Sequence, residues 1–152
     1  MTRSRPTRRS IVVASLVGVL HGCIVLWVYA HMRQQSVMTT FTGDGIGASL
    51  WTVWILLGLV ILGGTPVILF TQYRLIGPLA ALVSIYGVSA YMSFQTLSAA
   101  REVGATPSVT LRPDSAYILL WMFPLFVVLL IGGIEYLLRS KHDSPIASSR
   151  TE

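Results

Sequence analysis

Residues 11–30 read IVVASLVGVLHGCIVLWVYA, a run that contains no charged side chain. An α-helix rises 1.5 Å per residue, so this run is long enough to cross the hydrocarbon core of a bilayer, which is about 30 Å thick. Residues 50–70, 75–97 and 115–138 form three further apolar runs of the same kind. The sequence therefore predicts an all-α integral membrane protein, built as a bundle of four transmembrane helices.

The apolar runs account for most of the chain and leave no room for an independent soluble domain. Charged residues make up only 11% of the 152 residues, and the mean hydropathy is +0.69. We predict a basic N-terminal segment (1–10), a transmembrane domain (11–138) and a polar, Ser-rich tail (139–152). The composition of the tail is typical of a disordered segment.

The basic side chains are distributed unevenly between the two sides of the predicted bundle. Eight lie in the N-terminal segment, in the short turn at residues 72–74 or in the C-terminal tail, and three lie in the two opposite loops. The positive-inside rule then places both termini in the cytoplasm, and we expect the plasma membrane of a prokaryote. The four arginines before the first run are expected to contact anionic lipid headgroups rather than nucleic acid; they are Arg3, Arg5, Arg8 and Arg9.

Cys23 is the only cysteine, which excludes an intrachain disulfide and a cysteine zinc cluster. It follows Leu20-His21-Gly22, which resembles a lipobox, and the preceding Arg8-Arg9 resembles a loose twin-arginine signal. The apolar run continues for seven residues beyond Cys23, which an export signal does not require. We favour an uncleaved first span, and the signal remains the alternative.

Two stripes of small residues follow helical spacing. Ala14, Gly18 and Gly22 are four residues apart in the first run, and Ala80, Ser84 and Gly87 form a similar stripe in the third. Small side chains let helix backbones approach closely in lipid, where burial of apolar surface gives no drive for association. The stripes predict helix packing, either inside the bundle or with a partner protein or a second copy.

His21 lies near the middle of the first run and flanks its small-residue stripe. A histidine at this depth can relay protons or bind a metal or haem. The apolar runs, however, contain no second His and no Asp, and their only cysteine is Cys23. The simpler expectation is a neutral imidazole hydrogen-bonded to a neighbouring helix, with Ser84 or Tyr86 as candidate partners. We therefore predict no metal, cofactor or catalytic residue.

Glu135 is the only acidic residue within an apolar run. It lies three residues from the end of the fourth run, and Arg139 follows it at i+4, which favours an ion pair at the membrane interface. Contact with His21 is not expected, because His21 lies about 15 Å from its end of the bundle and Glu135 about 5 Å. The charges of Arg101, Glu102 and Asp114 are expected to be solvated loop charges.

Three functions remain open at this point. The first is a non-catalytic subunit, assembly factor or anchor that acts through helix–helix contacts. The alternative is an oligomeric transporter or channel for ions, protons or small solutes, in which polar residues line a path: His21, Thr65, Ser84 and Glu135. A cofactor-dependent or lipid-modifying enzyme is the least supported, because the spans lack a recognisable set of ligands or catalytic residues.

Overall fold

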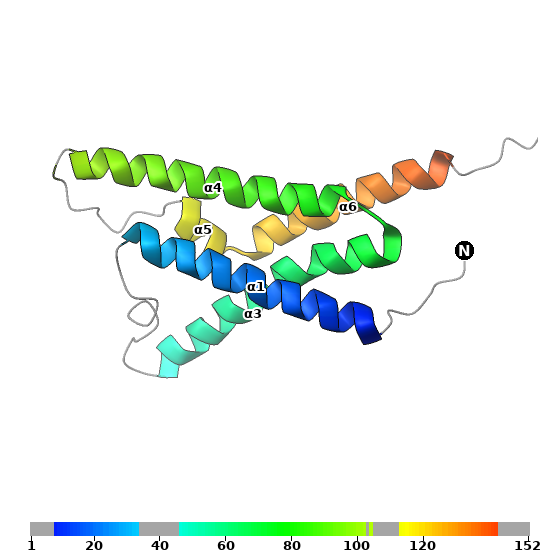
Figure 1. Cartoon of the computed structure of the whole chain (residues 1–152), viewed down its shortest axis with the longest axis horizontal. Helices are drawn as coiled ribbons and strands as arrows, with labels where there is room; N and C mark the ends of the chain where they lie inside the picture. Colours follow the sequence, from blue (N-terminus) through cyan, green and yellow to red (C-terminus); the bar gives the residue numbers. More distant parts are fainter. Residues whose placement is uncertain (1–7, 34–45, 103, 105–112, 143–152) are drawn as a thin grey trace, which may run out of the picture.

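The computed structural model describes residues 8–33, 46–102, 104 and 113–142, and all the regular elements in those ranges are α-helices. The predicted all-α class is therefore confirmed for this part of the chain. Arg3, Arg5 and residues 143–152 of the predicted disordered tail lie outside the described residues. The helices, in chain order, are α1 (Arg8–Arg33), α3 (Ile46–Tyr73), α4 (Gly77–Glu102), α5 (Pro113–Leu119) and α6 (Met122–His142) (Figure 1).

Four of the helices are long and apolar enough to cross a membrane: α1, α3, α4 and α6. Only 17% to 39% of the most apolar window of each is buried inside the protein, so most of the apolar surface of these helices faces outward. Apolar surface of this extent is typical of a protein surrounded by lipid. The candidate spans are Arg8–Met32, Leu50–Tyr73, Gly77–Glu102 and Met122–Lys141.

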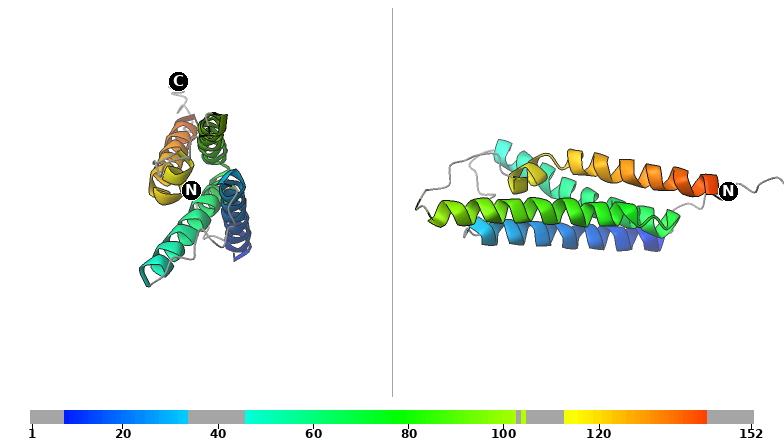
Figure 2. Two further views of the ribbon diagram at one scale, coloured as in Figure 1. Left: turned by 90° about the vertical axis from the view of Figure 1, so that its left-hand side faces the viewer. Right: turned by 90° about the horizontal axis from the view of Figure 1, so that it is seen from above.

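The helices α1, α3 and α4 run between two ends of the bundle, and α6 runs from its middle to one of them (Figure 1). This end, which we call the terminal end, contains the start of α1, the start of α4 and the end of α6, and the other, the loop end, contains the ends of α1 and α4 (Figure 1). α1 lies antiparallel against α3 in the most extensive contact of the fold, and α4 packs against both α5 and α6. Seen along the bundle, α4 and α6 lie together on one side of the α1–α3 pair (Figure 2).

The structure divides the predicted fourth span, 115–138, into α5 and α6, with the break at Leu120 and Trp121. Pro124 supplies the physical reason, because proline has no N–H to bond the carbonyl four residues earlier and its ring clashes with that carbonyl. That carbonyl belongs to Leu120, and it accepts a hydrogen bond from the Phe123 N–H instead, at 2.8 Å. The chain therefore changes direction before the long helix α6 begins.

A single apolar core lies where α1, α3, α4, α5 and α6 meet. Trp121, at the helix break, is 5% exposed, and its indole fills the space beside Gly58 of α3. Trp121 therefore belongs to the core, whereas Trp27, Trp51 and Trp54 are exposed. The buried members of the core are Val25, Ile55, Leu59, Leu62, Ala81, Leu82, Tyr117, Ile118, Trp121 and Val128.

Candidate functional site

The small-residue stripe of α1 packs against α3. A Cβ atom added at Gly18 would overlap the carbonyl oxygen of Val60 and lie 3.2 Å from the backbone nitrogen of Gly64. One at Gly64 would lie 3.0 Å from the carbonyl oxygen of Ala14, and one at Gly22 would lie 3.5 Å from Leu59. Here the two backbones are in direct contact, and only glycine allows this approach at position 18.

The stripe of α4 has the opposite placement. Ala80, Ser84 and Gly87 are all exposed, and a Cβ atom at Gly87 would meet no atom within 4 Å. Tyr91 continues this face one turn later, and its hydroxyl accepts a hydrogen bond from the Gln95 amide at 2.8 Å. We call Ala80, Ser84, Gly87 and Tyr91 the outward face of α4. The two stripes that the sequence suggested are therefore not packed against each other.

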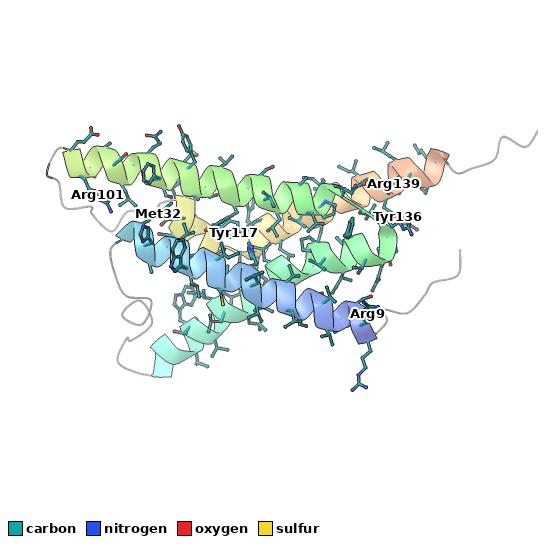
Figure 3. The ribbon with its side chains drawn as sticks, in the orientation of Figure 1. Arg9, Met32, Arg101, Tyr117, Tyr136 and Arg139 are labelled. Carbon is teal, nitrogen blue, oxygen red and sulfur yellow. The ribbon has the colours of Figure 1, made fainter. Side chains whose placement is uncertain are left out.

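His21 is half-buried and lies in an aromatic cluster between α1, α4 and α5. Its Nε2 atom is 3.1 Å from the hydroxyl of Tyr117, and the tautomer of the ring decides which group donates. The Tyr86 ring approaches the imidazole edge-on, with ring centroids 6.0 Å apart. A tyrosine of another helix thus holds His21, as the simpler expectation has it, but the tyrosine belongs to α5 (Figure 3).

Tyr86 and Tyr117 continue the cluster toward the loop end, with ring centroids 5.3 Å apart. The Tyr86 hydroxyl oxygen is buried, and no group in the described part of the chain is hydrogen-bonded to it. A small cavity of about 10 Å³ lies beside it, bordered by α1, α4 and α5. Among the side chains around the cavity are those of Tyr29, Ser89 and Asp114.

Asp114 is the main residue that sequence reasoning misplaced. It is only 8% exposed, not solvated, and its carboxylate accepts a hydrogen bond of 2.9 Å from the hydroxyl of Ser93, which is fully buried in α4. The Ser93 oxygen in turn accepts a bond of 2.9 Å from the Asp114 backbone N–H. This reciprocal pair joins α4 to the start of α5. The available signal was the position of Asp114 directly before an apolar run, where an acidic residue favours a helix start.

Glu135 connects α6 to the start of α4 at the terminal end. Its carboxylate accepts hydrogen bonds from the backbone N–H groups of Gly77 and Ile76, at 2.8 and 3.3 Å. It also pairs with Arg139 at 2.6 Å, as the i+4 spacing predicts. Arg139 donates a second bond, of 2.9 Å, to the backbone carbonyl of Arg74 (Figure 3). We call this arrangement the terminal clamp. In it Arg139 bonds to the segment that follows α3, and its ion-pair partner Glu135 bonds to the beginning of α4.

The clamp and the aromatic cluster lie apart, as the depth estimate for His21 and Glu135 predicts. Along α4, the buried side chains of Ala81 and Leu82 lie between Gly77, in the clamp, and Tyr86, in the cluster. Along α6, Val128 is completely buried between Trp121 and Glu135. The structure therefore shows apolar packing, and not a row of polar groups, between the two polar regions.

Arg101 and His31 make further contacts near the loop end. Arg101, which we expected to be solvated, donates a hydrogen bond of 2.7 Å to the backbone carbonyl of Met32 and so bonds the end of α1 (Figure 3). His31 stacks on Trp27, with ring centroids 5.3 Å apart.

Cys23 is exposed on α1. Within the ranges that the structure describes, no three His, Cys, Asp or Glu side chains gather in a way that could hold a metal ion.

Comparisons of the chain with protein-family models, with curated proteins and with solved structures give no significant match.

Proposed function

We propose that this protein crosses the plasma membrane four times, with both termini in the cytoplasm. Support comes from the four apolar helices and from the charges at the terminal end, where Arg8, Arg9, Arg74, Arg139 and Lys141 lie. Basic residues are enriched on the cytoplasmic side of membrane proteins. In this orientation the N-terminal arginines contact anionic headgroups of the inner leaflet.

In this membrane the protein acts as a non-catalytic component, a subunit, assembly factor or anchor, that binds a transmembrane helix of another protein. The observation that carries this proposal is the outward face of α4. α4 is the least apolar of the four candidate spans, yet only 22% of its most apolar window is buried. Ser84 and Gly87 thus face the surroundings, where lipid offers the Ser84 hydroxyl no partner and the missing side chain of Gly87 lets another helix approach closely.

The placement of the polar residues favours this function over the oligomeric channel. His21 bonds to Tyr117, and Glu135 bonds to the terminal clamp, so both are committed to contacts within their own chain. Thr65 donates to the carbonyl of Ile61 in its own helix. Association of several copies would therefore not bring these residues to a shared path, and Ser84 alone is too little to line one.

The experiment compares two glycines that are both exposed in long helices and have open space around them. Gly87→Ile places a branched side chain on the outward face of α4, and Gly133→Ile places the same side chain on α6, where a Cβ atom also meets nothing within 4 Å. Each variant is purified in mild detergent, and co-eluting proteins are identified and quantified by mass spectrometry.

We expect one defined membrane protein to co-elute with the wild type and with Gly133→Ile, and to fall at least tenfold in amount with Gly87→Ile. A wild-type protein that elutes without a partner contradicts the proposal. Equal recovery of the partner with both variants excludes the α4 face as its binding surface. A stoichiometric homo-oligomer without another protein makes a second copy of this chain the partner instead.

A further inference from the structure

The turn between α3 and α4 holds an exposed basic residue, Arg74, in an unusual backbone conformation. Its φ is 54°, in the left-handed region, and within the described ranges it is the one residue other than glycine with a positive φ. Glycine is the usual residue at such a position directly after a helix, because a Cβ atom is strained there. A strained residue that the fold retains points to a role for its side chain.

The backbone on both sides of Arg74 is held in place. Its N–H donates to the carbonyl of Phe70 at 2.8 Å, and its own carbonyl accepts the 2.9 Å bond from Arg139. The next residue, Leu75, is buried. Arg74 itself is exposed, and its guanidinium group forms no hydrogen bond or ion pair with another described residue. A cation that is free to bind a ligand is thus attached to a fixed backbone.

The surroundings of Arg74 match the headgroup region of a membrane. Tyr73 of α3 and Tyr136 of α6 are both exposed, and their rings meet edge-on with centroids 5.7 Å apart. Tyrosines are enriched at this level of a bilayer because the ring is apolar and the hydroxyl is polar. Figure 3 shows Tyr136 and Arg139 at the same end of α6. Glu135, the one acidic side chain described at the terminal end, is paired with Arg139 and so does not offset the charge of Arg74.

We propose that Arg74 and the Tyr73–Tyr136 pair form a binding site for the headgroup of an anionic phospholipid. The planar guanidinium group donates two parallel hydrogen bonds to the phosphate oxygens. The two tyrosine rings and the exposed side chain of Phe70 provide apolar surface for the glycerol and acyl chains of the lipid. A lipid of net negative charge is favoured, because the ammonium group of a zwitterionic lipid offsets the charge of its phosphate.

This lipid site requires the membrane location proposed above, and it does not require partner binding by the outward face of α4. It also differs from the headgroup contacts of the N-terminal arginines, since those follow from charge near the membrane alone. At Arg74 the direct contact of one side chain with the phosphate decides binding. Removal of this charge should therefore weaken binding much more than removal of another charge at the same end.

The test uses the full chain in neutral detergent. Phosphatidylglycerol, or phosphatidylcholine with the same acyl chains, is titrated into the protein, and native mass spectrometry quantifies the bound lipid. Arg74→Gly removes the side chain and keeps the turn, because glycine adopts a positive φ without strain. Lys141→Gln is the matched control, since Lys141 is also an exposed charge at the terminal end. Circular dichroism checks that both variants retain the helix content of the wild type.

We expect the wild type to bind phosphatidylglycerol about tenfold more tightly than phosphatidylcholine. The affinity for phosphatidylglycerol should fall about tenfold in Arg74→Gly and less than about threefold in Lys141→Gln, because a hydrogen-bonded phosphate contributes more than a screened surface charge. Equal affinity of the wild type for the two lipids overturns the site. An equal loss in both variants also overturns it, because binding then reflects general attraction to the basic end.

Two further measurements identify the cause of a failure. Glycerol phosphate carries the phosphate of the lipid without acyl chains, and its displacement of the lipid at equal concentration overturns the lipid as the ligand. Extraction of membranes with alkaline carbonate tests the membrane location. A protein that carbonate releases does not cross the membrane, and the proposed function then fails together with this site. A protein that is retained but lacks the lipid preference overturns the Arg74 site alone.

Discussion

The contact between Gly18 and α3 is the most exacting test of the fold. Gly18→Ala adds a single carbon atom at the point where α1 and α3 are closest. That atom would overlap the carbonyl oxygen of Val60 and lie 3.2 Å from the backbone nitrogen of Gly64. Both neighbours are backbone atoms in the interior of a helix, so neither can turn away as the end of a side chain could. We therefore expect the two helices to separate.

The size of the effect follows from this geometry. Restoring an ordinary carbon–oxygen contact needs a separation of about 1 Å, which forfeits a quarter to a half of the dispersion energy of the neighbouring contacts. Overpacking of this kind typically costs about 1–3 kcal/mol. At an open site in a helix, the same replacement of glycine by alanine is instead favourable by up to about 1 kcal/mol. The two kinds of site should thus differ by roughly 3 kcal/mol.

The assay is reversible unfolding in mixed micelles of mild detergent and dodecyl sulfate, followed by circular dichroism. Gly133→Ala is the control, because a Cβ atom there meets nothing within 4 Å. Gly64→Ala should give an intermediate loss, since its added atom would lie 3.0 Å from the carbonyl oxygen of Ala14. If Gly18→Ala and Gly133→Ala unfold within about 0.5 kcal/mol of each other, the inferred backbone contact between α1 and α3 is refuted.

Two further predictions concern polar contacts that join helices, both measured by the same unfolding assay. Glu135→Ala removes the acceptor of the Gly77 N–H and the partner of Arg139. Hydrogen bonds to a charged group contribute about 1.5–3 kcal/mol and a half-exposed ion pair contributes less than about 1 kcal/mol, so we expect the free energy of unfolding to fall by about 2 kcal/mol. A change below about 0.5 kcal/mol would contradict the terminal clamp. Asp114→Ala leaves the buried Ser93 hydroxyl without its acceptor and should cost about 1–3 kcal/mol; adding Ser93→Ala should then cost little more, and a double-mutant cycle without coupling would refute the pair.

The four apolar helices could be predicted from sequence because length and hydrophobicity alone decide them. The break at Leu120 was harder, although Pro124 was visible in the sequence. A proline acts on the carbonyl four residues before it, and inside a span that carbonyl can be bonded in several ways. Here the Phe123 N–H takes the bond, which ends the helix at residue 119. Only the local backbone geometry distinguishes this from a kink within one helix.

The candidate site was predictable only where its partners are close in sequence. The Glu135–Arg139 pair follows from i+4 spacing, and it is present. The bonds from Glu135 to the start of α4 bridge residues 58 and 59 positions apart and depend on how the turn before Gly77 folds. Likewise, the Tyr117 partner of His21 is 96 residues away, and its position depends on the helix break. The spacing of residues in the sequence therefore predicts neither of these contacts.

Substitutions of the buried polar residues and substitutions on the outward face of α4 should have different effects: the first on folding and the second on partner binding. In lipid, a polar side chain gains most when another polar group bonds it, and in this bundle His21, Ser93 and Glu135 have such bonds within the chain. Substitutions at these positions should therefore weaken folding first, and any loss of function should follow the loss of folded protein. Gly87 differs, because its surroundings within the chain are open. A variant there that folds normally but loses its partner would show that the α4 face evolved for contact outside the bundle, which no effect on stability could imitate.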